Sequence, residues 1–162
     1  MKENAPIPYP GGPGWKRHIA AEILQPLFDV VSGEITSKKA GVTLGAARTS
    51  GRVKDFWISV LHCGDKENDV PLQISGELFI NGTSCITTRP SIEALSGETA
   101  THKTTKVSGD TGVTQAVINR TSDVDMFTAG DVFTYDLTIN RTSPDTEIRN
   151  IVVCVELEPI KL

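Results

Sequence analysis

The strongest constraint on the fold is an alternation of apolar and polar side chains near the end of the sequence. Successive side chains of a β-strand point to opposite faces of the sheet, so a period of two indicates a strand with one buried face. Residues 131–159, DVFTYDLTINRTSPDTEIRNIVVCVELEP, follow this period twice, with a break at Ser143-Pro144-Asp145. The sequence therefore predicts a hairpin of two strands. The first strand is expected to bury Phe133, Tyr135, Leu137 and Ile139, and the second Ile151, Val153, Val155 and Leu157.

Two predicted strands also carry apolar residues on the face that points away from the core. In the last strand these residues are Val152 and Cys154. A sandwich sheet buries only its inner face, so an apolar outer face needs a second cover. That cover is residues 15–26 of the same chain, a long loop or another subunit, and all three remain open. The strand expected at 53–62 places Phe56, Ile58 and Val60 on one face and Val53, Trp57 and Leu61 on the other.

The rest of the chain after residue 26 also has strand character. Asn81-Gly82 is the signal of a type I′ hairpin turn, and Gly109-Asp110 and Ala129-Gly130-Asp131 mark further turns. About eight short antiparallel strands separated by turns predict an all-β chain, folded as a single jelly-roll-like β-sandwich. Besides the final pair, the expected strands are 27–36, 42–47, 53–62, 72–80, 83–88, 102–107 and 113–118.

The first 26 residues are predicted to be an extended N-terminal arm, and residues 27–162 the sandwich domain. Residues 1–14 contain four prolines and three glycines, which favour extended polyproline-like backbone and cannot build a core. Residues 15–25, WKRHIAAEILQ, place apolar side chains at helical spacing and stop before Pro26. A short helix and an extended segment are both compatible with this stretch.

Composition limits the classes of partner. The 162 residues carry a formal net charge of -4 with no basic stripe, which argues against a dedicated nucleic-acid binder. No apolar run approaches the length of about 18 residues that spans a bilayer, and the start lacks the apolar region of a signal peptide. We therefore expect synthesis in a cytosol and no membrane partner. Cys63, Cys85 and Cys154 lie within strand-like runs, and we expect buried free thiols.

The sequence contains no recognisable catalytic constellation. His18, His62 and His102 are far apart and lack a metal-binding partner motif. The loop at 63–70 has acidic residues at alternate positions but lacks the glycine and final glutamate of an EF-hand, so a solvated loop is favoured over an ion site. No Gly-x-Ser-x-Gly elbow or phosphate-binding loop occurs. We expect no enzymatic activity and no cofactor.

Two segments carry a resemblance to a known family. Residues 52–87, RVKDFWISVLHCGDKENDVPLQISGELFINGTSCIT, and residues 113–157, VTQAVINRTSDVDMFTAGDVFTYDLTINRTSPDTEIRNIVVCVEL, resemble the jelly-roll capsid cement, or decoration, proteins of tailed bacteriophages. The shared elements are an early strand with two apolar faces, a long loop, an ING hairpin, an AGD turn and a valine-rich last strand. The resemblance covers roughly residues 51–158.

This resemblance implies a viral structural protein that binds the outside of a phage head and stabilises contacts between capsomers. It implies a homotrimer, the major capsid protein as partner, synthesis in the host bacterial cytoplasm and a place on the capsid surface of the virion. It requires no active site. The candidate capsid or subunit contacts are Ile7, Tyr9, Trp57, Leu61, Val152 and Cys154.

Two other functions remain open on the same fold. A head-fibre or tail module that binds a receptor or carbohydrate would stack sugars on exposed aromatic side chains, of which this chain has few. A glycan array distinguishes this function from capsid binding. A hydrolase built on a β-sandwich is disfavoured by the missing constellation, and a broad hydrolase screen tests it.

Overall fold

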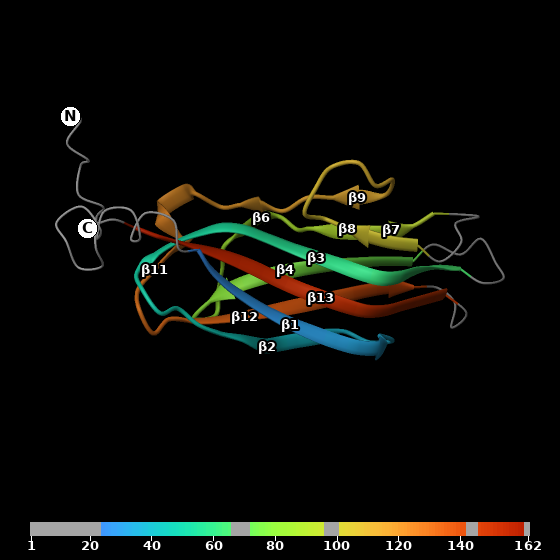
Figure 1. Cartoon of the computed structure of the whole chain (residues 1–162), viewed down its shortest axis with the longest axis horizontal. Coiled ribbons are helices and arrows are strands. Elements are labelled where there is room, and N and C mark those ends of the chain that lie inside the picture. Colours follow the sequence, from blue (N-terminus) through green and yellow to red (C-terminus); the bar gives the residue numbers. More distant parts are fainter. Residues whose placement is uncertain (1–23, 66–71, 96–100, 142–145, 161–162) are drawn as a thin grey trace, which may run out of the picture.

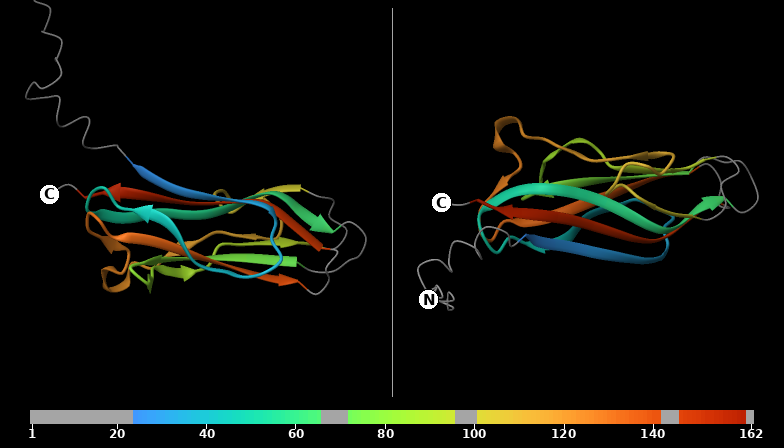
Figure 2. Two further views of the ribbon diagram at one scale, coloured as in Figure 1. Left: turned by 90° about the horizontal axis from the view of Figure 1, so that it is seen from below. Right: turned by 45° about the horizontal axis from the view of Figure 1, so that its top comes forward.

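The structure of this chain is a computed structural model that describes residues 24–65, 72–95, 101–141 and 146–160. It consists of two antiparallel sheets packed face to face, as the two layers in Figure 2 show. Ile7, Tyr9, residues 15–23 of the possible helix and most of the loop at 63–70 lie outside the described residues. Within the described part, no helix is long and apolar enough to cross a membrane.

The strand order is that of a jelly roll, so the predicted all-β sandwich is confirmed (Figure 1). The long strands β1, β2, β3 and β4 alternate between the two large sheets, as do β12 and β13, and the last strand lies between the first and the third. We call the two layers the first sheet and the second sheet. The first sheet has the order β1 (Gln25–Glu34), β13 (Thr146–Pro159), β3 (Gly51–Asp65), with β8 (Thr101–Thr104) and β11 (Met126–Phe127) both pairing with β3. The second sheet has the order β2 (Lys39–Ala46), β12 (Val132–Arg141), β4 (Leu72–Ile80), β7 (Ser91–Ala94), β9 (Val113–Thr114), with β5 (Thr83–Ser84) pairing with β4.

The expected hairpin of the last two strands is wrong. β12 pairs with β2 and β4 in the second sheet, whereas β13 pairs with β1 and β3 in the first sheet. The chain therefore crosses from one layer to the other between these strands. Alternation specifies only that one face of each strand is buried, and a strand of either layer satisfies this condition. The inward residues are nonetheless those that the pattern predicts, since Phe133, Tyr135, Leu137, Ile151, Val153, Val155 and Leu157 are buried.

The outward position expected for Val53 is also wrong, because a β-bulge shifts the alternation of β3. Asp55 pairs with Glu156 and Val53 with Leu157, so Lys54 is an extra residue in β3. Val53 therefore lies on the inner face and is fully buried, while Phe56, Ile58 and Val60 keep their predicted inward positions.

A second irregularity crosses all three long strands of the first sheet at one level. In β1 the register shifts between Val31 and Glu34, and the N–H of Gly33 donates to the side-chain oxygen of Asn150 in β13 over 2.9 Å. Gly33 and Asn150 both have positive φ, of 77° and 55°. In β3 the register against β8 shifts between Val60 and Cys63. The alternation is thus interrupted in neighbouring strands together, which keeps them paired through the bend.

The Asn81-Gly82 turn has the predicted form. Both residues have positive φ, 48° and 84°, as a type I′ turn requires, and β4 pairs directly with β5 on its other side. The Asn81 amide donates to Asp131 over 2.8 Å and its oxygen accepts the N–H of Val132 over 2.9 Å. The predicted hairpin turn is therefore tied to the predicted turn before β12.

Two of the predicted strands are divided in the structure. The run at 83–88 forms β5 and then β6 (Ile86–Thr88), which leaves the second sheet and pairs with β10 (Val117–Ile118). The run at 113–118 correspondingly forms β9 and β10. β7 and β11 were not expected, because two to four residues are too few to display a period. A 3₁₀ turn at Thr121–Asp123 follows β10.

Two glycines lie where neighbouring residues leave little room for a side chain. A Cβ at Gly51 would lie 2.2 Å from the carbonyl oxygen of Glu158, whereas one at Gly76 would lie 3.2 Å from a methyl group of Ile58. We expect Gly76→Ala to lower the free energy of unfolding by about 1–3 kcal/mol, the usual cost of overpacking. Gly51→Ala is expected to lower the free energy of unfolding further, because the backbone of Glu158 cannot move aside as the Ile58 side chain can. Urea denaturation measures both, and equal losses would contradict this geometry.

Candidate association surface

The outward side of the first sheet carries six apolar side chains, which we call the outer apolar face. Three of them are strongly exposed: Phe28 at 63%, Val30 at 52% and Leu61 at 65% of the full exposure of the residue. These three alone leave on the order of 300 Å² of apolar surface in water, within the range of the largest patches on monomeric proteins. The outer apolar face comprises Phe28, Val30, Trp57, Leu61, Val152 and Cys154.

The register of the three long strands brings these residues into rows. Cys154 of the central strand pairs with Phe28 of β1 on one side and with Trp57 of β3 on the other. In the neighbouring row, Val152 pairs with Val30 and with Ser59. Neighbouring strands lie about 4.8 Å apart, so each row is a contiguous contact surface. The structure thus brings together Trp57, Leu61, Val152 and Cys154, the four described candidate residues.

Sequence reasoning missed Phe28 and Val30, which are the most exposed part of this face together with Leu61. The stretch was recognised as a strand, but Asp29 occupies an inward position between them and breaks the apolar pattern of the inner face. The Asp29 carboxylate accepts a hydrogen bond of 2.7 Å from the hydroxyl of buried Tyr135. Burial, together with the hydrogen bond and charge of Asp29, raises the pKa of Tyr135. An inward carboxylate with a tyrosine partner cannot be recognised from β1 alone.

The outward side of the second sheet is polar by comparison. Lys38 pairs with Asp136 over 3.2 Å, and Glu77 binds Arg89 and accepts a hydrogen bond from Ser84. These groups are charged or hydroxylated. Val132 of β12 is exposed on this side too, at 40%, but the larger group of exposed apolar side chains lies on the first sheet.

Side chains or proline occupy part of each long border of the first sheet, and β8 and β11 pair with further parts of β3. At the β1 edge, Pro26 lacks an N–H and the N–H of Val30 donates to the Asp29 side chain over 2.9 Å. At the β3 edge, the N–H of Phe56 donates to the Asp55 side chain over 2.8 Å, and that of Ile58 to the hydroxyl of Thr105 over 3.0 Å. Such edges are poor templates for pairing with another strand. Association through this sheet therefore favours its face.

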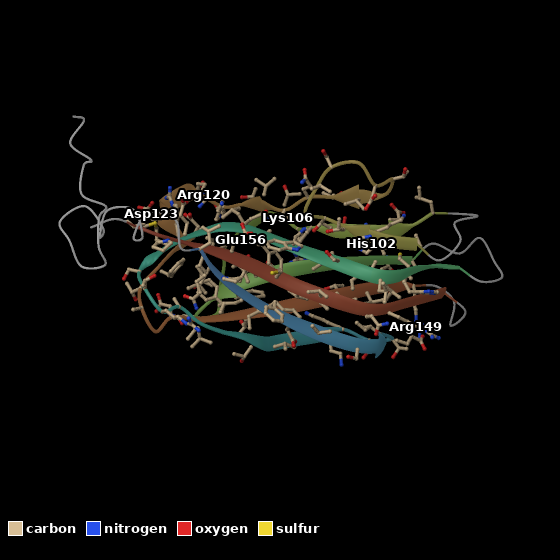
Figure 3. The ribbon with its side chains drawn as sticks, viewed as in Figure 1. His102, Lys106, Arg120, Asp123, Arg149 and Glu156 are labelled. Carbon is tan, nitrogen blue, oxygen red and sulfur yellow. The ribbon has the colours of Figure 1, made fainter. Side chains whose placement is uncertain are left out.

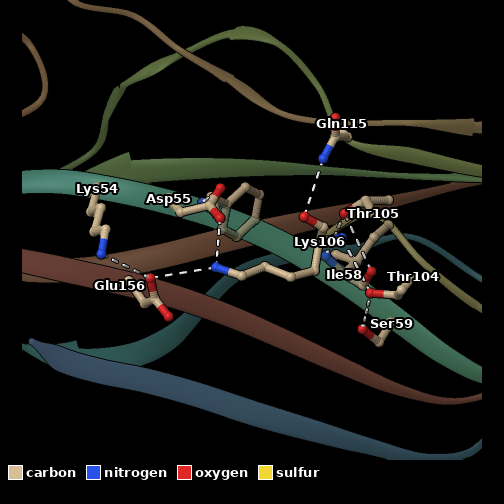
Figure 4. A network of polar contacts seen from close by, with 10 residues as sticks. Lys54, Asp55, Ile58, Ser59, Thr104, Thr105, Lys106, Gln115 and Glu156 are labelled. Carbon is tan, nitrogen blue, oxygen red and sulfur yellow. Dashed lines mark hydrogen bonds and ion pairs between the residues drawn. The ribbon is translucent and has the colours of Figure 1, made fainter. Parts of the chain in front are cut away.

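A network of charges borders the outer apolar face beside Trp57 (Figure 4). The ammonium group of Lys106 lies 3.9 Å from the centre of the Trp57 ring, 2.7 Å from Asp55 and 3.4 Å from Glu156. Burial by itself lowers the pKa of Lys106, but the hydrogen bonds and charges of the two carboxylates outweigh it and raise the pKa above its usual value. Lys106 thus covers one side of the indole and ends the apolar surface there.

The other charged groups of this side of the molecule lie apart from one another. Figure 3 shows Lys106 and Glu156 near the middle of the first sheet, Arg120 and Asp123 towards one end, and His102 and Arg149 towards the other. In the described part of the chain, no group of three His, Cys, Asp or Glu side chains is placed to hold a metal ion. Asp125 is fully buried and forms ion pairs with Arg52 and Arg120, which joins the turn before β11 to the start of β3.

The three cysteines are free thiols, as expected from the sequence, but only two of them are buried as expected. Cys63 and Cys85 are buried, and burial raises the pKa of Cys85 to about 12. Cys154 is only partly buried, because it lies on the outer apolar face. Burial and the nearby Glu156 carboxylate raise the pKa of this thiol too. Cys154 therefore serves as a chemical probe of whatever covers the face.

Comparison with known proteins gives one structural match. No protein-family model matches the sequence, and no curated protein matches it. Among solved structures, the chain is similar to a chain in the structure of infectious bursal disease virus, Gx strain, with 13% sequence identity and a TM-score of 0.46. The match covers 85% of this chain and 33% of that chain, so this chain spans a third of the length of its structural neighbour.

The charge network predicts how stability depends on pH. A raised pKa of Lys106 in the folded state means that the charged side chain stabilises the fold below its unfolded pKa of about 10.4, and that this stabilisation is lost as pH rises through the folded pKa. We expect Lys106→Met to be less stable than the wild type at pH 7, by up to about 1 kcal/mol. The difference should shrink above about pH 10.5.

Urea denaturation of both proteins from pH 7 to pH 11 measures this difference. Lys54→Met is the matched control, because Lys54 lies 4.0 Å from Glu156 and is more exposed, and its effect should be smaller. A Lys106→Met protein as stable as the wild type at pH 7 would show that the network contributes nothing.

Proposed function

We propose that this chain is a non-enzymatic structural protein of a virus particle, and more closely a capsid cement or decoration protein of a tailed bacteriophage. The observation that carries the proposal is the outer apolar face of the first sheet. It is three strands wide, and Phe28, Val30 and Leu61 on it are strongly exposed. A surface of this kind suits association with another protein surface.

The proposed partners are two further copies of the chain and the major capsid protein on the outside of a phage head. A homotrimer at a point where capsomers meet would join neighbouring capsomers and resist internal pressure. Each contact needs only modest affinity, because three linked attachments raise the effective concentration of the second and third. The protein would be made in the host bacterial cytoplasm and end on the virion surface.

The N-terminal arm supplies the second proposed contact with the shell. Residues 1–14 carry Ile7 and Tyr9 among prolines, whose restricted backbone lowers the entropy cost of ordering the segment on a partner. Each arm would add a small net free energy, and a trimer would carry three of them.

The proposal predicts that charge placed on the outer apolar face weakens shell binding, because this face would contact either the shell itself or a neighbouring copy whose attachment strengthens that binding. The double variant Phe28→Lys and Leu61→Lys changes two side chains that are already in water, so we expect it to fold with a near-normal melting temperature. Its binding to emptied heads of the phage that encodes the chain should fall at least about tenfold. Cosedimentation with the heads measures the binding.

The matched control for this variant is Thr138→Lys, an exposed position on the outward side of the second sheet. It adds a charge of the same sign to the opposite layer and should bind heads normally. Undiminished binding of the double variant would remove the face from the proposed interface.

A second prediction concerns the arm. Replacing Ile7 and Tyr9 together by serine removes two apolar contacts without touching the described sandwich. We expect an unchanged melting temperature by circular dichroism and measurably weaker binding to emptied heads. Normal binding would show that the arm is not a strap on the shell, and loss of folding would show that it belongs to the core.

The alternative function is a receptor- or carbohydrate-binding module on a head fibre or tail. It draws support from Phe28 and Trp57, two aromatic side chains that share a row of the sheet on either side of Cys154. Against it, Lys106 already occupies one face of the Trp57 ring. Binding on a glycan array, or electron microscopy that places the protein at a fibre tip, would favour this function over shell attachment.

A further inference from the structure

The chain enters the first sheet at Gln25, at the end of β1 that is close to Phe28 of the outer apolar face. The Gln25 amide donates to the carbonyl of Ala46 over 3.0 Å, and its oxygen accepts the N–H of Arg48 over 2.8 Å, which fixes the first residue of β1 to the second sheet. Gln25 precedes a proline, so its backbone is held extended. The first paired residue of β1 is Gln25, opposite Leu157, so the preceding segment joins the sheet at this end.

The segment that precedes Gln25 has apolar side chains that could cover an apolar surface. Residues 15–23, WKRHIAAEI, place Trp15, Ile19 and Ile23 at intervals of four, with charged residues between them. Nine residues span about 14 Å as a helix or about 30 Å when extended, and the face occupies about six residues of β1, or about 20 Å. The segment is thus long enough to cover the outer apolar face when it is extended, and as a helix it would cover about two thirds of the face's length.

The same segment lacks the means to turn back onto its own sheet. Between Trp15 and Gln25 there is no glycine, proline, asparagine, aspartate or serine, the residues that reverse a chain most readily. The extended Gln25 and its clamp to the second sheet leave no room for a reversal at the entry point itself. These features favour contact of the segment with a neighbouring molecule over contact with its own face.

We propose that residues 15–23 of one copy lie on the outer apolar face of a second copy. The inference rests on the proposed homotrimer and specifies how its subunits are joined. The contact is heterologous, since the segment of one chain meets the sheet of the next, and such contacts close into a ring when the rotation between copies permits. Three exchanged segments would bury Phe28, Val30 and Leu61 of all three subunits.

Cross-linking through Cys154 tests this arrangement in the full chain. Cys63 and Cys85 are buried, so in the folded wild type Cys154 is the thiol within reach of reagents. The variant Ile19→Cys adds a second thiol in the exchanged segment. After treatment with a short bis-maleimide, we expect denaturing gels to show covalent dimers and trimers, and we expect Ile19→Cys combined with Cys154→Ala to show none. Light scattering of the untreated Ile19→Cys protein confirms that it still assembles.

A second variant tests the contact without introducing a thiol. Replacing Ile19 and Ile23 together by glutamate places charges against the apolar face. We expect light scattering to report one chain instead of three, circular dichroism to report an unchanged β-sandwich, and maleimide labelling of Cys154 to become at least tenfold faster than in the wild type. Ile7→Glu, which lies outside the exchanged segment, should keep three chains and slow labelling.

Four outcomes would overturn the exchange. They are a cross-link between Ile19→Cys and Cys154 within one chain, Cys154–Cys154 dimers in the wild type, a trimer that survives the glutamate substitutions, and a monomeric wild type with rapid labelling of Cys154. The binding of wild-type protein to emptied heads is measured separately. If heads are bound while the exchange fails, the proposed function stands and the face is left for the shell.

Discussion

The pairing of β13 with its two neighbours is the interaction on which the rest of the first sheet depends. β13 pairs with β3 from Thr146 to Pro159, and it is the strand that holds β1 in the sheet. Phe28 and Val30 reach the outer apolar face only because β1 is aligned on Cys154 and Val152. The first sheet therefore requires residues from both ends of the described chain, and such long-range pairing makes folding slow relative to a helical protein of this size.

The sequence was sufficient to predict the fold class and most inward residues, because alternation reports directly which face of a strand is buried. It was insufficient where a β-bulge adds a residue and so shifts the alternation of inward and outward side chains. The bulge at Lys54 moved Val53 from the expected outer face to the core, and nothing in the letters around it marks an extra residue. The assignment of β12 and β13 to different layers was also beyond reach, since the choice of partner strand depends on the whole topology.

The candidate surface was predicted in part for a related reason. Trp57 and Cys154 were recognised because their strands have apolar residues at consecutive positions. Phe28 and Val30 were overlooked because Asp29 gives β1 an ordinary polar content, although its carboxylate is directed inward to Tyr135. A polar residue at a core position thus concealed two apolar residues at solvent positions. The arrangement of Lys106 over Trp57 depends on a loop contact between distant parts of the chain and has no local signal.

The side chains at the borders of the first sheet have a consequence for how the molecule associates. An apolar sheet with an open edge can add identical strands without limit, and that growth is the route to amyloid fibres. Here Pro26 and the side chain of Asp29 block one border, while Asp55 and Thr105 block the other. Association is thereby directed to the outer apolar face, which can bind only a fixed number of partners. The molecule can therefore associate through this face without open-ended growth.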